Sequence, residues 1–219
     1  LLAKNLTGYK NLMKIVSKSH LEGFYYKPRT DIELLREHSE GLICLSACVN
    51  GYVSEPLLNN QEDEAIERMK TLQEIFPDDF YFELQRHINV PPQEPLNQKL
   101  LVLSKKYGVP IVATNDNHYI SKSDAEAQEI LLCIGTQTTI DTPNRKLSMM
   151  DSPDFYIKSG DEMAQAFADL PQAIENTNKI AEKCNLEISL GKWIMPSFSV
   201  PNNASPADYI REQVYEGVT

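Results

Sequence analysis

Residues 109–114 read VPIVAT, and the polar tetrapeptide NDNH at 115–118 follows at once. The first six residues are short, apolar and rich in β-branched side chains, a pattern typical of a strand buried on both faces of a parallel sheet. Polar residues directly after such a strand lie at its carboxyl end, where α/β folds place their binding sites. This stretch therefore indicates both a fold class and the place to look for chemistry.

Two further strands and two helices are predicted upstream of this stretch. Residues 41–47 (GLICLSA) form a second buried strand, and 80–85 (FYFELQ) alternate as a third. Apolar residues at helical spacing predict one helix over 62–76 and another around 96–107. Strand, helix, strand, helix, strand is the order of an α/β domain with parallel strands, so we expect the α/β class.

The flanking segments are predicted to be helical, and the chain is expected to divide near its end. A first helix ends before Gly23, and a short second helix follows over 31–40. Three more helices are expected after residue 120, two of them after the capping patterns of Ser121 with Asp124 and of Ser159 with Glu162. Residues 191–205 are rich in Pro and Asn and lack periodicity, which is typical of a linker. We therefore expect a domain over 1–190, a linker over 191–205 and the start of a further helix over 206–219.

Charge and cysteine content limit the function classes. The chain has 21 basic and 31 acidic residues, a net charge of −10, and its longest basic run is a Lys pair at 105–106. Such a chain repels a phosphate backbone and is a poor candidate for the main DNA grip. No apolar run approaches the roughly 20 residues of a membrane span. Four cysteines without a CxxC pair indicate reduced thiols and a cytoplasmic protein.

Asp116 and His118 are the first candidate site residues. In an extended segment, residues two apart point the same way, so both side chains can aim at one point beyond the strand end. A carboxylate and an imidazole suit zinc, manganese or iron. The alternative is a polar loop with a capping Asp and a surface His.

Cys48 and His87 follow the other two predicted strands. A thiolate at Cys48 would be a soft metal ligand on the same rim, and the alternative is a buried structural thiol. For His87 a solvated loop histidine is the default expectation. The remaining cysteines lie in a strand or on apolar helix faces and are expected in the core: Cys44, Cys133 and Cys184. The residues alone thus predict an α/β domain with a candidate metal site.

Several stretches resemble bacterial DNA polymerase III alpha subunits, in the same order along essentially the whole chain. They include LLAKNLTGYKNL (1–12), EGFYYKPR (22–29), GLICLSAC (41–48), VATNDNHY (112–119), DAEAQEILLCI (124–134), ENTNKIAEKC (175–184) and IMPSFSVP (194–201). The resemblance implies the C-terminal half of the PHP (polymerase and histidinol phosphatase) domain, part of a distorted (β/α)7 barrel followed by helices, up to the start of the palm.

The resemblance also implies roles for the candidate residues. Asp116 and His118 would be the late Asp-x-His ligand pair of the PHP metal site, and Cys48 the ligand after the middle strand. His87 matches no ligand position and remains a site neighbour. The early His-x-His motif and the polymerase aspartates are absent from this sequence, so we expect this segment alone to be inactive.

For the parent protein, the resemblance implies DNA-directed DNA synthesis in chromosome replication, a magnesium-dependent nucleotidyl transfer. The PHP site would contribute a 3′–5′ exonuclease that uses zinc, manganese or iron. Expected partners are DNA, deoxynucleotide triphosphates, a proofreading subunit and a sliding clamp, with no membrane. The alternatives are a non-catalytic PHP scaffold and a stand-alone PHP phosphoesterase, and the choice between a replicative and an error-prone paralogue stays open.

Overall fold

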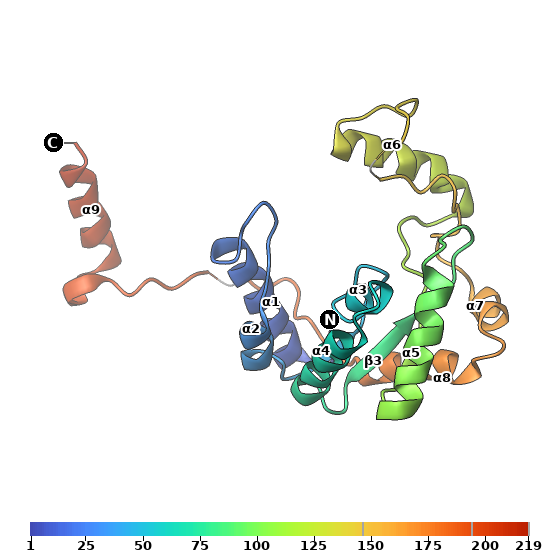
Figure 1. Cartoon of the computed structure of the whole chain (residues 1–219). Helices are drawn as coiled ribbons and strands as arrows, with labels where there is room; N and C mark the ends of the chain where they lie inside the picture. Colours follow the sequence, from blue (N-terminus) through green and yellow to red (C-terminus); the bar gives the residue numbers. More distant parts are fainter. Residues whose placement is uncertain (146, 194, 219) are drawn as a thin grey trace. The chain divides into compact units, whose positions relative to one another are not determined.

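The computed structural model describes residues 1–145, 147–193 and 195–218, which form two compact units, Leu1–Glu187 and Ile188–Thr219 (Figure 1). The larger unit contains the sheet and every candidate site residue. The predicted linker and the helix after it include residues 194 and 219, which lie outside the described residues.

A four-stranded sheet lies at the centre of the larger unit. Its order is β1 (Leu2–Ala3), β2 (Leu42–Leu45), β3 (Phe80–Leu84) and β4 (Ile111–Ala113). The last three strands are parallel, as predicted, but β1 pairs antiparallel with β2 and the sheet is mixed. The sequence did not predict β1, since two residues are too few to show an alternating pattern.

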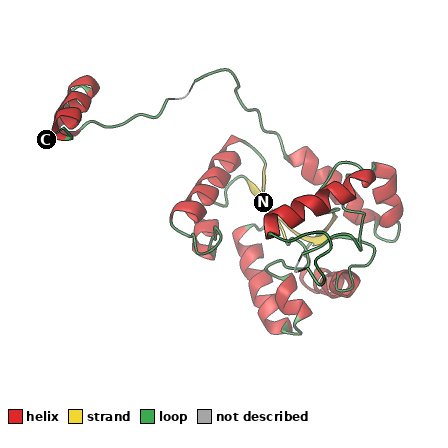
Figure 2. Ribbon diagram, turned by 90° about the horizontal axis from the view of Figure 1, so that it is seen from above, coloured by secondary structure: helices red, strands yellow, loops and turns green. Residues whose placement is uncertain are grey.

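The strand residues alternate between two apolar clusters, one on each face of the sheet. Even-numbered residues of β2 and β3 enter the larger cluster, including the fully buried Phe82. On the other face, Ile43, Tyr81 and Val112 form a smaller cluster with Ile180. Ile180 lies in the last turns of α8 (Pro171–Lys183). Both faces are covered, as the apolar strand sequences indicate, and Figure 2 shows helices around the strands.

Five helices connect the strands. They are α1 (Leu6–Leu21), α2 (Ile32–Glu37), α3 (Ser54–Leu58), α4 (Glu62–Ile75) and α5 (Gln93–Tyr107). Asn5 caps α1 by accepting a hydrogen bond from Gly8 N at 3.0 Å, and Gly108 ends α5 at a left-handed φ of 72°. The sequence did not predict α3, because five residues are too few for a helical period to show.

Two glycines allow α1 to touch the start of β2. A Cβ added to Gly8 would lie 1.9 Å from Gly41 O, and one added to Gly41 would lie 2.6 Å from Gly8 N. Gly41 also has a left-handed φ of 73°. Backbone packs on backbone here, which no larger residue permits.

The part of the larger unit after β4 is built from helices and loops, and α8 is the helix of this part that packs on the sheet. It forms the 3-10 turn η1 (Lys122–Asp124), α6 (Ala125–Thr136), α7 (Gly160–Ala166) and then α8. The predicted capping boxes at Ser121 and Ser159 are both present. The amide of Asn176 and the hydroxyl of Thr177, on α8, donate to carbonyls of β4 at 2.8 and 2.9 Å.

The smaller unit contains the 3-10 turn η2 (Pro201–Asn203) and α9 (Pro206–Glu216), which starts at a Ser205 cap with Pro206 in its first turn. Of the helices in the described ranges, none is both long and apolar enough to cross a membrane.

Candidate metal site at the strand ends

Glu83 joins the carboxyl ends of the three parallel strands. Its carboxylate accepts hydrogen bonds from Ala47 N beyond β2 at 3.1 Å, from Thr114 Oγ1 beyond β4 at 2.5 Å and from Gln85 Nε2 at 3.2 Å. Its own N–H donates to Ser46 Oγ at 2.9 Å. These bonds fix the spacing of the strand ends, and with it the positions of the loops that carry the predicted ligands.

The loop after β4 is held in an unusual conformation. Asp116 has a φ of 46°, in the left-handed region that non-glycine residues rarely adopt. His118 Nδ1 lies 2.6 Å from the backbone O of Asp116. Because a carbonyl only accepts, Nδ1 carries the proton and Nε2 is left with its lone pair. The side chain of His118 is therefore oriented in the way that protein metal ligands usually are.

Asn115 attaches this loop to the segment before α7. Its side-chain amide is buried and donates to Tyr156 O at 2.7 Å and to Asp154 O at 3.1 Å. The His118 N–H donates to Phe155 O at 2.8 Å. The segment around Phe155 thus covers the inner side of the loop.

Phe155 brings His87 and His118 to the same ring. The His87 imidazole stacks on Phe155 at 4.0 Å between centroids, and His118 meets Phe155 edge-on at 5.5 Å. The side chain of His87 is only 1% exposed, and neither of its ring nitrogens has a hydrogen-bond partner. The default expectation of a solvated loop histidine is therefore wrong, because Phe155, distant in sequence, buries the ring.

Asp154 lies beside His87, with Oδ1 3.6 Å from Nδ1. Burial lowers the pKa of His87 below its usual value, and the nearby Asp154 carboxylate only partly opposes this. Burial raises the pKa of Asp154, but hydrogen bonds from Ser152 and Ile88 and the charge of Lys158 outweigh it, so that pKa is lower than usual. A charged carboxylate next to a neutral imidazole is the stable pair at neutral pH.

Cys48 lies in the half-exposed loop after β2, on the same edge of the sheet as Asp116 and His118. Because β3 lies between β2 and β4, their strand ends are separated by about 10 Å, two interstrand spacings. Among the residues that the structure describes, no three His, Cys, Asp or Glu side chains gather closely enough to hold a metal ion. The edge is shared, but the predicted ligands do not form a closed group.

The other cysteines divide by burial. Burial raises the pKa of the Cys44 thiol to about 11, so it is a neutral core residue, as predicted. Cys133 is buried on α6, and Cys184 is half-buried against the smaller apolar cluster.

The donor set nevertheless fits a borderline divalent ion in type. A half-exposed thiol, a carboxylate and an imidazole with free Nε2 are the ligands that zinc, manganese or iron use.

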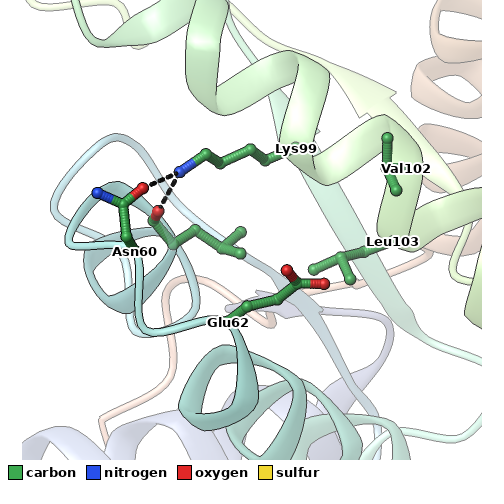
Figure 3. Close-up of a pocket in the computed structure, with 6 residues that line it drawn as sticks. Asn60, Glu62, Lys99, Val102 and Leu103 are labelled. Carbon is green, nitrogen blue, oxygen red and sulfur yellow. Dashed lines mark hydrogen bonds between the residues drawn. The ribbon is translucent and has the colours of Figure 1, made fainter.

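A pocket between α3 and α5 holds none of the predicted ligands (Figure 3). Lys99 Nζ donates there to Leu57 O at 2.6 Å and to Asn60 Oδ1 at 3.0 Å. The ammonium thereby satisfies a carbonyl at the end of α3. Because this cation already has two hydrogen-bond partners within the protein, the pocket serves to connect α3 and α5. It is a weaker candidate for a functional site than the carboxyl ends of the strands.

The sequence interpretation did not find the positioning residues. It assigned no role to Glu83, Asn115 or Phe155. Glu83 gave a signal, since a carboxylate inside an otherwise apolar strand needs a partner. Phe155 gave none, because its partners are 37 and 68 residues away in the sequence.

Comparison with known proteins agrees with the resemblance found in the sequence. A family model described as PHP domain matches residues 1–87. The DNA polymerase III subunit alpha of Borreliella burgdorferi is 44% identical over 220 residues, covering 100% of this chain and 19% of the relative. That of Thermus aquaticus is 41% identical over 227 residues, covering 100% and 18%. The chain therefore spans about a fifth of the length of these curated relatives.

Proposed function

The chain belongs to the family of bacterial DNA polymerase III alpha subunits, and from this premise we propose that it contributes part of a divalent metal site to the PHP domain of such a subunit. Cys48, Asp116 and His118 would hold metal of the zinc, manganese or iron class, with further ligands from residues that this sequence does not contain. The full site would hydrolyse phosphodiesters as a 3′–5′ exonuclease.

The orientation of His118 is the observation that carries this proposal. A hydrogen bond from Nδ1 to its own loop leaves Nε2 as the only basic ring atom, directed away from that bond. The left-handed φ of Asp116 shapes the turn that brings its backbone O to His118 Nδ1.

The chain's own residues would have distinct roles in such a site. Asp116 and His118 would be ligands, so neither would be free to act as a base. Glu83 would keep the three strand ends in register, and Phe155 would keep water from the inner side of His118. Bound metal would supply an activated water and charge neutralisation at the phosphate.

We infer the remaining properties from the parent family. The whole protein would be a DNA-directed DNA polymerase of the cytoplasm that uses magnesium and deoxynucleotide triphosphates and assembles with a proofreading subunit and a sliding clamp. Residues 1–190 would belong to a distorted (β/α)7 PHP barrel, 191–205 to a linker and 206–219 to the beginning of the palm side. The segment alone would be inactive.

A non-catalytic scaffold is the second candidate. The bonds of Glu83 between the strand ends and the packing on Phe155 would serve it equally, because they hold the loops without any metal. A stand-alone phosphoesterase is disfavoured, because the similarity to polymerase subunits covers the smaller unit as well as the sheet.

Elemental analysis of the full-length parent protein, purified without added metal, tests the proposal. We expect bound zinc, manganese or iron in the wild type and its loss in an Asp116→Asn/His118→Ala variant. His20→Ala, on an exposed part of α1, is the matched control and should retain the metal. Equal metal in all three proteins would refute these ligands, and no metal in any of them would leave the scaffold.

A further inference from the structure

Residues 24–29 (FYYKPR), between α1 and α2, form an exposed turn that we call the aromatic hairpin. Tyr25 N donates to Lys27 O at 3.0 Å and closes a tight antiparallel bridge. Three consecutive aromatic side chains remain in solvent: Phe24 is 60%, Tyr25 63% and Tyr26 83% exposed. Adjacent exposed aromatic rings are unusual on a soluble surface and mark a contact site.

The hairpin has a closed base and contacts between its own side chains. A Cβ on Gly23 would lie 2.1 Å from Arg29 O, so the base of the hairpin is closed backbone to backbone. Tyr26 adopts a φ of 60°, which is strained for an aromatic residue. Tyr25 packs edge-on to Tyr26 at 4.7 Å, and the Arg29 guanidinium lies 5.1 Å over the Tyr25 ring.

The hairpin lies on the side of the molecule that carries the candidate metal site. The residues directly after it, Thr30 and Asp31, line one apolar pocket together with Ser46 and Ala47, the residues beyond β2. Cys48 follows these two in the sequence. In Figure 1 the hairpin is the dark blue loop that extends from the ends of α1 and α2. The segment that follows the hairpin therefore lies beside the loop that leads to Cys48.

We propose that the aromatic hairpin binds single-stranded DNA and guides it to the strand-end rim. Exposed aromatic rings stack on bases of any sequence, and a guanidinium beside a ring adds a cation for the backbone. Lys27 and Arg29 would contact phosphates, and the tyrosines would stack on bases. This proposal rests on the proposed function, because it names the substrate class of that site.

Charge on the hairpin gives the proposal a quantitative signature. The neighbouring acids Glu22, Asp31 and Glu33 exclude a broad electrostatic grip, so stacking must supply most of the affinity. With at most two phosphates neutralised, the slope of log affinity against log salt is expected near about −1.4. A binding site that depends on many cations would give a much steeper slope.

Fluorescence anisotropy with the 219-residue chain and a labelled oligo(dT), in EDTA, tests the proposal without any metal. Tyr25→Ala and Tyr26→Ala are each expected to weaken binding by about 5- to 150-fold, the loss of one stacked base. Tyr25→Phe is the matched control and should bind within about twofold, because the ring remains. The wild-type chain should bind an oligonucleotide of abasic sugars no more tightly than the alanine variants bind oligo(dT).

Ultraviolet crosslinking of a bromouracil-substituted oligonucleotide, followed by peptide mapping, gives a second readout that does not depend on variants. Adducts on residues 24–29 are expected. Failure of the wild-type chain to bind oligo(dT) at millimolar concentration would overturn the proposal and leave the hairpin as a protein contact. So would equal binding by the alanine variants, or adducts only elsewhere. None of these results depends on metal, so they are distinguishable from failure of the metal site.

Discussion

In the sheet the large side chains are hidden, whereas in the segment after β4 many are in solvent. Phe82 and Leu84 are completely buried between helices, but Leu131 and Ile134 on α6 are 61% and 69% exposed. The sheet is stabilised by apolar burial. The segment over 115–158, apart from residue 146, depends on a small number of polar anchors.

The buried ion pair of α6 illustrates the second regime. The side chain of Glu129 is 0% exposed, and its Oε1 lies 2.5 Å from Arg145 Nη1. Its other carboxylate oxygen accepts a hydrogen bond from Met149 N at 2.9 Å. Burial by itself raises the pKa of Glu129, but the Met149 amide, Ser148 and Arg145 outweigh it and leave that pKa below its usual value. From this difference we expect substitutions in the sheet to lower the free energy of global unfolding. Substitutions in the segment should lower only the free energy of its local opening.

Phe82→Ala should have the largest effect. It removes a fully buried ring from the main cluster, and we expect a loss of about 3–5 kcal/mol in the free energy of unfolding. Urea denaturation followed by circular dichroism measures it. Val102→Ala on the 62% exposed face of α5 is the control, with an expected change within about 0.5 kcal/mol. Similar losses in both variants would contradict a sheet held by burial.

Arg145→Met should have a smaller effect that is confined to the segment. It leaves the buried Glu129 carboxylate without its cation, at a cost of about 3 kcal/mol in local opening. Hydrogen exchange should show faster exchange at Met149 N and unchanged protection in β3. Arg36→Met breaks the exposed pair with Glu74 and should cost less than about 1 kcal/mol. A loss of protection in β3 would show that the two regions unfold together.

Asn115→Ala should loosen the rim by less. It leaves the carbonyls of Asp154 and Tyr156 without their hydrogen-bond donor. We expect the local free energy of opening to fall by about 1–3 kcal/mol, seen as faster exchange of the His118 amide. Asn185→Ala removes an exposed bond to Glu182 O and is the matched control. Unchanged exchange at His118 would mean that Phe155 alone holds the loop.

His87 should give the smallest effect, as a pH dependence. Its pKa is lower in the folded state than the ordinary value of 6.5, so the unfolded state binds more protons when the pH falls below about 6.5. The contribution of the neutral ring is therefore complete above that pH and is lost progressively on acidification. Denaturation between pH 7.5 and 5 should show a weaker dependence in His87→Gln, while exposed His20→Gln should follow the wild type.

Much of the fold could be predicted from local sequence patterns. The strand runs at 41–47, 80–85 and 109–114 each contain a real strand, because buried parallel strands need continuous apolar sequence. The capping pair of Ser159 and Glu162 marked α7 correctly, since a cap depends on neighbours in sequence. In contrast, β1 and α3 were missed because each is shorter than the period that would reveal it.

The candidate site was predicted less completely, for a physical reason. Asp116 and His118 follow a strand, so their position could be inferred from one segment. The burial of His87 depends on Phe155, and the spacing of the strand ends depends on Glu83. Both are long-range contacts that no single segment encodes. Whether Cys48 joins the same metal site stays a prediction.

The contact between Gly8 and Gly41 has a consequence for how this sequence can evolve. Each residue already excludes a methyl group from the other's backbone, so a first substitution at either position forces α1 away from β2. Once that separation has occurred, a second substitution at Gly8 adds no further clash, whereas one at Gly41 still carries the strain of its left-handed φ. The two positions are therefore expected to be non-additive in a double-mutant cycle.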